Sequence, residues 1–450
     1  MTCSPNEKSV LFITLGCAKN EVDTDRMRAL LLSDGFAEAD DPEGADVAIV
    51  NTCSFLASAT EESVEATLEL AEGRAEGVRE LPIVMCGCVP SRYGDDLPEQ
   101  LPEVAAFVKA EDEDGICSVV RGVLGMGDAR ISDGVTGPLR TVSGASAFVK
   151  ISEGCDRFCT FCAIPYIRGR YYSRTADEII SEVQGLLEGG VREIVLIGQD
   201  TGIWGSDFKD GSTLAGLLRQ VAEVARPYDA WLRVLYLQPE GMTDELIATI
   251  RDVPEVLPYI DIPIQHCSER ILKDMNRSGN PKQLHELFAR LRKEIPGMVL
   301  RTTGMAGFPG ETDEEADELY DFIKAEEFDY TSVFAYSQEE GTRAAEMDGQ
   351  VDEDVKLERT QRLIDLVEEL GFSATAKHVG ERVRVIIDGV EEGEDGVELI
   401  GHTWFQAPDC DGAVHIASGE AAVGDIVTVD LVDSFCYEMV GEIVADGEAS

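Results

Sequence analysis

The sequence predicts an α/β fold in three parts: an N-terminal parallel α/β sheet domain (1–135), a central partial, TIM-like (β/α)6 barrel (145–372) and a small C-terminal β-barrel (373–447). In the first two parts, short apolar strands alternate with helical patterns, which is typical of parallel sheets. From about residue 375 only short strands with acidic and glycine-containing turns remain. With 450 residues, the chain is long enough to form several separate cores.

The N-terminal part contains strand patterns separated by helical ones. A helix between two strands allows the strands to run parallel, so we expect one sheet with helices against its faces. A glycine-rich, weakly patterned stretch follows and is the predicted linker. The expected strands are 10–15, 47–50 and 83–85, the expected helices are 20–33 and 57–71, and the linker is 122–144.

The central part contains six strand patterns, most of them followed by a helical pattern. Six β/α units predict an open version of the eight-fold barrel, with chemistry at the carboxyl ends of its strands. Two helix starts carry the T-x-x-E capping box, at Thr175 with Glu178 and at Thr312 with Glu315. The expected strands are 148–152, 193–197, 231–237, 259–264, 299–305 and 330–336.

The C-terminal part has strand patterns and no helix of normal length. Short strands at close spacing predict a small barrel or sandwich. The expected strands are 382–387, 397–400, 413–416 and 426–431.

The charge balance is strongly acidic, with 38 Lys and Arg against 87 Asp and Glu, a formal net charge of −49. Such a chain should repel nucleic-acid phosphates and attract basic partners, so nucleic-acid binding is not expected. A host with a generally acidic proteome would explain the same balance. The sequence shows neither a signal peptide nor a membrane-spanning run, which predicts a cytoplasmic protein without a membrane partner.

The strongest local signal is a C-x3-C-x2-C triplet, Cys155, Cys159 and Cys162, directly after a predicted strand. In a chain without an export signal, clustered thiols indicate metal binding or catalysis rather than disulfides. Three thiolates can hold a cubane iron–sulfur cluster and leave one iron open to a small molecule. The alternative is zinc, but structural zinc normally takes four protein ligands, and no fourth Cys or His stands nearby.

A second set of cysteines is spread over the N-terminal part. Cys17, Cys53 and Cys88 each follow a predicted strand. If the strands are parallel, the three thiols emerge at one edge of the sheet, where open α/β sheets bind ligands. This arrangement predicts a second three-thiolate cluster site. Buried cysteines also fill strand ends without binding metal, and Cys86 competes with Cys88 for the third place.

The triplet at the end of a barrel strand resembles the radical S-adenosylmethionine (SAM) superfamily. The runs LGCAKNEVD, NTCSF, GCVPSRY, ISEGCDRFCTFC, IPIQH and GFPGET narrow the resemblance to its methylthiotransferases over nearly the whole chain. The resemblance implies two 4Fe–4S clusters, an auxiliary one on Cys17, Cys53 and Cys88 and a radical-generating one on the triplet. It also implies SAM as both radical source and methyl donor, an external reductant and sulfur source, and a C-terminal TRAM domain.

Further candidate cofactor-binding residues lie at barrel strand ends and in the triplet. Polar groups at the carboxyl ends of such strands line the active face. Glycines allow a ligand to approach the backbone closely, although a simple turn would also use them. The aromatic ring within the triplet could shield a cluster or pack on adenine, or be an ordinary loop residue. The candidates are Phe161, Gln199, Asp200, Gln265, His266, Gly307 and Gly310.

The resembled family has two branches. One modifies adenosines of transfer RNA, and the other modifies the β-carbon of an aspartate in protein S-twelve of the small ribosomal subunit. The runs IGQDTGIWG and GHTWFQAPDCDG resemble the second branch. From Gly371 onward, 17 acidic residues stand against three basic ones, a net charge of −14. A TRAM domain that binds RNA should be basic, so this charge favours the basic ribosomal protein, free or within the subunit, as partner.

Overall fold

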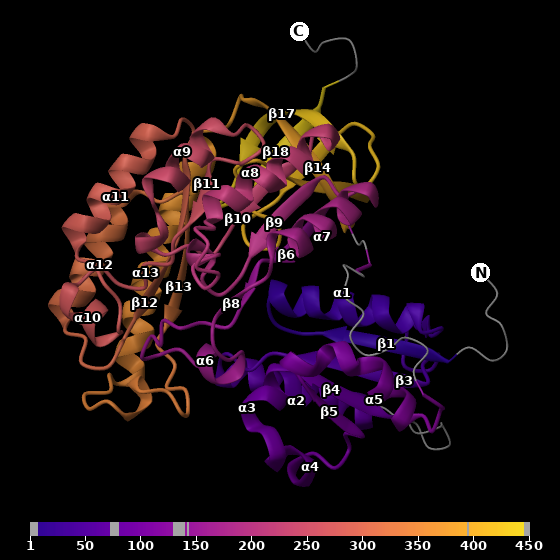
Figure 1. The fold of residues 1–450 in the computed structure, drawn as a ribbon. Helices are drawn as coiled ribbons and strands as arrows, with labels where there is room; N and C mark the ends of the chain where they lie inside the picture. The colour runs from indigo at the N-terminus through magenta and orange to yellow at the C-terminus, as the bar shows by residue number, and fades with distance from the viewer. Residues whose placement is uncertain (1–7, 73–80, 129–139, 142–143, 394–395, 445–450) are drawn as a thin grey trace. The chain divides into compact units, whose positions relative to one another are not determined.

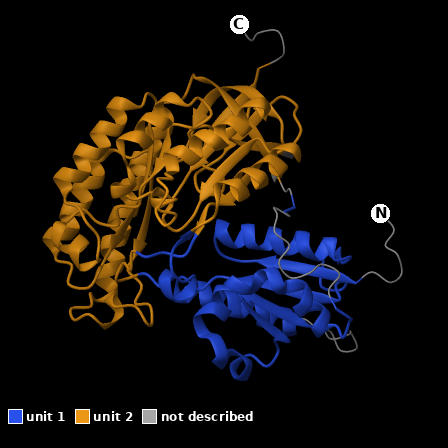
Figure 2. Ribbon diagram, in the orientation of Figure 1, with its two compact units in different colours: residues 1–141, 153–156, 162–172 blue, residues 142–152, 157–161, 173–450 orange. Residues whose placement is uncertain are grey.

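The chain forms two compact units in a computed structural model (Figure 2). Unit 1 comprises residues 1–141, 153–156 and 162–172, and unit 2 comprises residues 142–152, 157–161 and 173–450. The structure describes residues 8–72, 81–128, 140–141, 144–393 and 396–444. No helix within these ranges is long and apolar enough to cross a membrane.

Unit 1, coloured indigo to purple in Figure 1, is built on a five-stranded sheet in the order β2-β1-β3-β4-β5. Every neighbouring pair is parallel, which confirms the predicted N-terminal fold. The edge strands β2 and β5 were not predicted. The strands are β1 Ser9–Thr14, β2 Ala37–Glu38, β3 Val47–Thr52, β4 Ile83–Gly87 and β5 Ala106–Lys109.

Helices cover both faces of this sheet. Helices α1 and α5 pack on one face, where Val47 and Ile49 of β3 meet Leu30 and Ile116. Helices α2, α3 and α4 pack on the other face, around Val50 of β3. Because both faces are covered, β3 is buried throughout, as expected for a parallel sheet. The helices are α1 Ala18–Ser33, α2 Ala57–Glu72, α3 Cys88–Tyr93, α4 Leu97–Gln100 and α5 Ile116–Val123.

The predicted linker, 122–144, begins within the last turns of α5. Much of it lies outside the described residues. After it the chain enters unit 2, returns to unit 1 with 153–156 and 162–172, and then stays in unit 2. This returning segment contains α6 Ile164–Ile167, and the short strands β7 Ser152–Glu153 and β8 Tyr172–Ser173 lie at its two ends.

The central barrel of unit 2 is open, as predicted. It consists of two three-stranded parallel sheets, β6-β9-β10 and β11-β12-β13. They meet where the Leu237 N–H donates to Asp261 O at 3.0 Å, between the ends of β10 and β11. The strands are β6 Ser146–Lys150, β9 Glu193–Ile197, β10 Trp231–Val234, β11 Tyr259–Asp261, β12 Val299–Ala306 and β13 Tyr330–Ala335.

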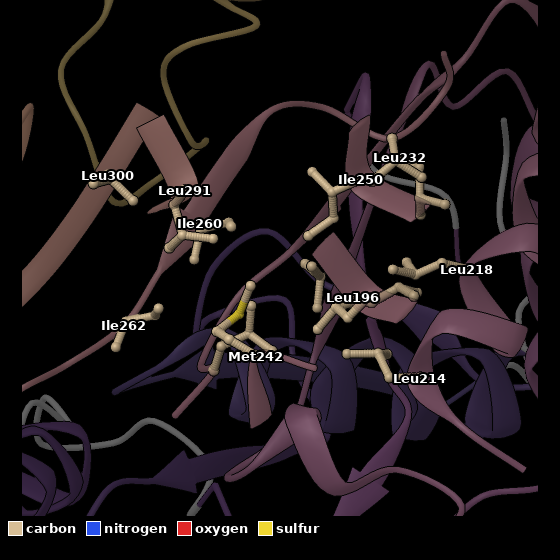
Figure 3. Packing of buried hydrophobic residues seen from close by; sticks show 14 of the residues in the cluster. Leu196, Leu214, Leu218, Leu232, Met242, Ile250, Ile260, Ile262, Leu291 and Leu300 are labelled. Atoms are coloured by element: carbon tan, nitrogen blue, oxygen red, sulfur yellow. The ribbon is translucent and has the colours of Figure 1, made fainter. Parts of the chain in front are cut away.

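Apolar side chains from the barrel strands pack against the surrounding helices. Figure 3 shows Leu196 and Leu232 of the strands near Leu214 and Leu218 of α8. Both predicted capping boxes are present, at the starts of α7 and α12. The helices are α7 Ala176–Glu188, α8 Leu214–Ala225, α9 Asp244–Asp252, α10 Glu269–Asp274, α11 Pro281–Glu294, α12 Asp313–Glu326 and α13 Glu353–Ala376.

The C-terminal strands close into a barrel in the order β14-β15-β16-β18-β17. This confirms the predicted small β-barrel, although its last strand was not predicted. The proposed boundary at residue 373 falls inside α13, which continues to Ala376. The strands are β14 Arg382–Gly393, β15 Gly396–Thr403, β16 Val414–Ser418, β17 Ile426–Ser434 and β18 Met439–Ile443.

Candidate functional site

The three separate cysteines of unit 1 lie at the carboxyl ends of adjacent strands. Cys17 follows β1 by three residues, Cys53 directly follows β3, and Cys88 directly follows β4 as the first residue of α3. Because β1, β3 and β4 are parallel neighbours, these ends share one edge of the sheet. The structure thus has the topology on which the predicted second cysteine site depends.

Close approach of the chain brings Cys17 and Cys53 together. Gly16 has a φ of +98°, and a Cβ atom at this position would lie 3.0 Å from Cys53 Sγ. Only glycine fits here, because any side chain would collide with Cys53 and would also strain the backbone. Burial raises the pKa of the Cys53 thiol, and the neighbouring Cys17 raises it further. The pKa of Cys88 is raised to about 11, by burial above all, and charges on Cys53 and Cys17 add to this rise.

Asn20 joins the three strand ends, a role that the sequence did not reveal. Its side-chain amide donates to Leu15 O at 2.9 Å and to Thr52 O at 2.8 Å. Its Oδ1 atom accepts from Cys88 Sγ at 3.9 Å. Asn20 is fully buried in the first turn of α1. Its only signal in the sequence is its position three residues after Cys17.

Cys88, and not Cys86, lies beside the other two cysteines. Cys86 is fully buried within the strand and packs in the apolar cluster that includes Val84 and Val108. Burial raises its pKa well above the ordinary value, and Glu113 adds to the rise. Cys88 lies beyond the end of the strand, where the chain turns into α3. Of the two, Cys88 is the one that contacts Asn20 and Arg168.

Arg168 is a second polar residue at this site that the sequence did not single out. Its side chain is 3% exposed and forms an ion pair of 2.8 Å with Asp23. Its Nη2 atom donates to Asn20 Oδ1 at 2.6 Å. The Arg168 charge opposes the effect of burial on the pKa of Cys88 and of Cys53. A cation near Cys53 and Cys88 favours the thiolate form that binds metal.

The triplet cysteines lie on a segment whose residues are divided between the two units. Cys155 and Cys162 belong to unit 1, and Cys159 belongs to unit 2. In unit 1 the Cys155 N–H donates to Gly169 O at 3.2 Å, and Ala163, next to Cys162, packs with Ile167 against Cys88. In unit 2 burial raises the pKa of Cys159, opposed by the charges of Arg277 and Arg157.

Hydrogen bonds within unit 2 hold the middle of the triplet loop. Arg157 donates to Asp200 at 2.5 Å and to Glu240 at 3.0 Å. The Thr160 N–H donates to Met275 O at 3.1 Å, and the Asn276 amide donates to Arg157 O at 2.9 Å. These contacts fix the backbone on both sides of Cys159.

Asp200 is the predicted strand-end residue that contacts this loop. Its side chain is fully buried, and burial raises the pKa of its carboxyl group, which Arg157 opposes. One of its oxygens, Oδ1, is buried and accepts no hydrogen bond from the protein. Gln199 is half-buried beside it. Phe161 packs in a cluster with Ile271 and Phe308, as an ordinary loop aromatic would.

The remaining candidates surround the end of β12. His266 Nδ1 accepts from the backbone N–H groups of Cys267 and Ser268, and Nε2 lies 3.3 Å from Glu311. Both ring nitrogens therefore have partners within the protein, and the ring is fully buried. The half-buried Gln265 next to it has a φ of +66°.

The two candidate glycines make contacts within unit 2. The Gly307 N–H donates to Glu311 at 2.5 Å, and a Cβ atom on Gly307 would lie 2.1 Å from Lys356 Cγ of α13. The Gly310 N–H donates to Gly349 O at 2.7 Å. Packing against Lys356 therefore accounts for Gly307, and a φ of +77° accounts for Gly310, without a ligand.

Both cysteine sets consist of thiols, which are the usual protein ligands of iron–sulfur clusters. Among the described residues, no three Cys, His, Asp or Glu side chains converge as ligands of one metal ion. At the N-terminal site the neighbouring thiols have a cationic neighbour in Arg168, which suits an anionic thiolate-bound cluster.

Comparison with known proteins gives three domain matches along the chain. Residues 149–323 match the Radical SAM superfamily, residues 9–109 match the uncharacterized protein family UPF0004, and residues 379–444 match the TRAM domain. Among solved structures, the radical SAM methyltransferase TsrM from Kitasatospora setae has a TM-score of 0.56 at 16% identity. The matched region covers 73% of this chain and 75% of the TsrM chain. This likeness supports the fold.

Fold and domain matches thus define a radical SAM enzyme with an N-terminal α/β domain and a TRAM barrel. A protein named ribosomal protein uS12 methylthiotransferase RimO, from Trichlorobacter lovleyi, is 41% identical over 98% of this chain and 99% of its own length. One of the same name from Geobacter sulfurreducens is 40% identical over 98% and 99%. The chain belongs to the RimO family of methylthiotransferases.

Proposed function

We propose that this chain attaches a methylthio group to the β-carbon of an aspartate in ribosomal protein uS12. The observation that carries the proposal is that Cys17, Cys53 and Cys88 follow three adjacent parallel strands at one sheet edge, in a chain that also has the radical SAM triplet. A single three-cysteine site is enough to generate a radical, so the second set indicates an additional step such as sulfur delivery. Similarity to RimO proteins over nearly the full length supports the substrate.

Each cysteine set is proposed to hold one 4Fe–4S cluster. Cys155, Cys159 and Cys162 would be the ligands of the radical-generating cluster, and Cys17, Cys53 and Cys88 those of the auxiliary cluster. When bound, the clusters and SAM supply the radical and the methylthio group, with electrons and sulfur from outside the chain. The protein contributes ligand placement, cations beside the thiolates and exclusion of water. The buried positions of Cys53, Cys88 and Cys155 suit that last task.

The proposed SAM-binding residues lie at the strand ends of unit 2. Asp200 has a buried oxygen without a protein partner and can accept a hydrogen bond from the cofactor. Gln199 and Gln265 remain proposals because of their positions after β9 and β11. Phe161, His266, Gly307 and Gly310 have partners within the unit, so for them we propose support of the cofactor-binding loops.

The acidic surface supports a basic protein as substrate. Ribosomal proteins that bind RNA are rich in Lys and Arg, and complementary charge speeds the encounter of two partners. The net charge of −14 from Gly371 onward lies in and beside the TRAM barrel. An RNA-binding TRAM domain would need the opposite sign.

The test is anaerobic incubation of the reconstituted enzyme with reductant, sulfide, SAM and purified uS12. Mass spectrometry should find one methylthio group on one aspartate, and about eight irons per chain should be bound before the reaction. Parallel reactions contain the assembled small subunit or unmodified transfer RNA, and a variant with alanine at all three triplet cysteines is the control. Modification of the transfer RNA, with uS12 unmodified, would contradict the proposal.

A further inference from the structure

Arg168 connects the two cysteine sets within unit 1. Its guanidinium contacts the N-terminal site through Asn20 and Asp23, as described above. The carbonyl of the next residue, Gly169, accepts from the Cys155 N–H at 3.2 Å. One short stretch of backbone therefore contacts a ligand of the radical site on one side and the surroundings of Cys88 on the other.

The contacts of Arg168 are directional. Its Nη1 atom faces Asp23 at 2.8 Å, with Glu153 further away at 3.7 Å, and its Nη2 atom faces Asn20 Oδ1. The planar fork of arginine can serve Asp23 and Asn20 together, whereas the ammonium group of lysine cannot reproduce this geometry. Arg168 thereby fixes Asn20 in the orientation that also accepts from Cys88.

Metal binding would change the contact between Cys88 and Asn20. Cys88 donates through its S–H group to Asn20 Oδ1 in the present structure. A metal-bound thiolate has no such proton, so Asn20 Oδ1 then faces a negative sulfur. The Arg168 guanidinium is the group that can hold Asn20 in place and offset the added negative charge.

The segment that carries Arg168 also packs on the N-terminal site. Ala163 and Ile167, at the two ends of α6, form a buried cluster with Cys88. Ala163 directly follows Cys162, so the last triplet cysteine stands next to this contact. A displacement of Cys88 would therefore move its packing partner Ala163, and with it the backbone beside Cys162.

We propose that Arg168 is a positioning residue that couples the two cysteine sets, so that loading the N-terminal site orders segment 162–172. The proposal rests on the function proposed above. Arg168 belongs to neither ligand set. Its proposed role is to order the segment that carries Cys162 once the auxiliary cluster is present.

The test uses two backgrounds that isolate the sites. An auxiliary-only protein has alanine at Cys155, Cys159 and Cys162, and a radical-only protein has alanine at Cys17, Cys53 and Cys88. Each background receives Arg168→Gln, Arg168→Lys or Arg170→Gln. Arg170 is the matched control, because it lies on the same segment with a side chain that is 76% exposed and pairs with Asp156.

In the auxiliary-only background, Arg168→Gln should lower bound iron at least twofold and shift the cluster's midpoint potential to more negative values. Loss of a nearby cation disfavours the more negative reduced cluster. Arg168→Lys should keep the potential near that of wild type and lose some iron, and Arg170→Gln should change neither. Hydrogen exchange of segment 162–172 should slow on loading in wild type and in Arg170→Gln, and stay unchanged in Arg168→Gln.

Iron binding in the radical-only background checks the fold, and should be the same for Arg168→Gln and Arg170→Gln. If Arg168→Gln loses iron there as well, its role is general stability and the inference is wrong. Equal potentials and equal exchange for the two variants would also overturn it. If the auxiliary-only protein with Arg168 intact binds no iron, the two-cluster proposal itself fails, and the inference fails with it.

Discussion

Arg233 and Glu193 form an ion pair of 2.7 Å in which neither side chain is exposed to solvent. Glu193 begins β9 and Arg233 lies on β10, so the pair spans two neighbouring strands of the central barrel. The same glutamate pairs with His402 of β15, which also contacts Asp388 of β14 at 2.6 Å. Buried charges thus attach the C-terminal barrel to the first strands of the central one.

This network predicts a dependence of stability on pH. Burial alone would lower the pKa of His402, but Glu193 and Asp388 outweigh it and raise that pKa from 6.5 to about 9. Protonated His402 therefore stabilises the fold fully below about pH 6.5, and this contribution is lost as the pH rises through about 9, on the order of 3 kcal/mol. Burial alone would raise the pKa of Glu193, but Arg233 and His402 lower it from 4.5 to about 2, so its contribution is lost below about pH 4.5.

Thermal unfolding followed by circular dichroism between pH 6 and 10 measures the alkaline loss. His402→Gln should melt at a lower temperature than wild type at pH 6 and lose less stability towards pH 10. The control is His285→Gln, whose side chain is 66% exposed in wild type. Parallel pH profiles for wild type and His402→Gln would show that this histidine does not carry the effect.

The two cysteine sets should fail in different ways when they are changed. Alanine at Cys155, Cys159 and Cys162 should reduce SAM cleavage to background, and alanine at Cys17, Cys53 and Cys88 should leave cleavage but stop methylthio transfer. Each set of changes should lower the iron content from about eight to about four per chain. Iron analysis with chromatography of 5′-deoxyadenosine and methylthiolated uS12 checks this. Normal transfer without the N-terminal set would refute the auxiliary site.

Gly154→Ala should damage the triplet loop more than Gly169→Ala does. Both glycines have positive φ, +71° and +75°, so both changes carry a backbone strain of roughly 1 kcal/mol. A Cβ atom on Gly154 would also lie 2.2 Å from Arg170 O, whereas one on Gly169 meets nothing within 4 Å. Iron retention in the radical-only background should fall severalfold for Gly154→Ala. If the two variants lost iron equally, backbone strain alone would explain the loss, and the predicted collision with Arg170 O would be wrong.

Asp200→Asn should weaken SAM cleavage by roughly tenfold, because it removes the charge that holds Arg157 beside Cys159. Glu240→Gln changes the other Arg157 partner, whose side chain is 42% exposed, and should have a much smaller effect. Single-turnover cleavage and SAM affinity, measured separately, distinguish a misplaced loop from a lost cofactor contact. Wild-type values for Asp200→Asn in both assays would remove this residue from the site.

Much of the fold could be predicted, because its strands are continuous apolar runs. The expected bounds of β9 agree with the structure, and those of β1, β3 and β12 differ by one or two residues. The strands β2, β5 and β18 could not be predicted in the same way. β2 has two residues, β5 is a short edge strand, and β18 is interrupted by Gly441, which packs against Val429.

The residues of the site that belong to a local sequence pattern could be predicted. The residues that meet only through the packing of distant segments could not. The cysteines of the N-terminal set could be found because each one follows an apolar run that predicts a strand, and both the run and the cysteine are visible in the sequence. Asn20 and Arg168 lie 148 positions apart, and no local pattern shows that their side chains meet. For the same reason the sequence could not show that Lys356 of α13 packs against Gly307.

The hydrogen bonds of Asn20 determine when the N-terminal site can form during folding. Three of its partners are Leu15 just after β1, Thr52 of β3 and Cys88 at the start of α3, so the three thiols reach their places only after these separate stretches have come together. Such long-range pairing is slow compared with helix formation. A nascent chain that ends before Cys88 therefore lacks both the third thiol and one of the contacts of Asn20, so this site is completed only after residue 88 has been synthesised.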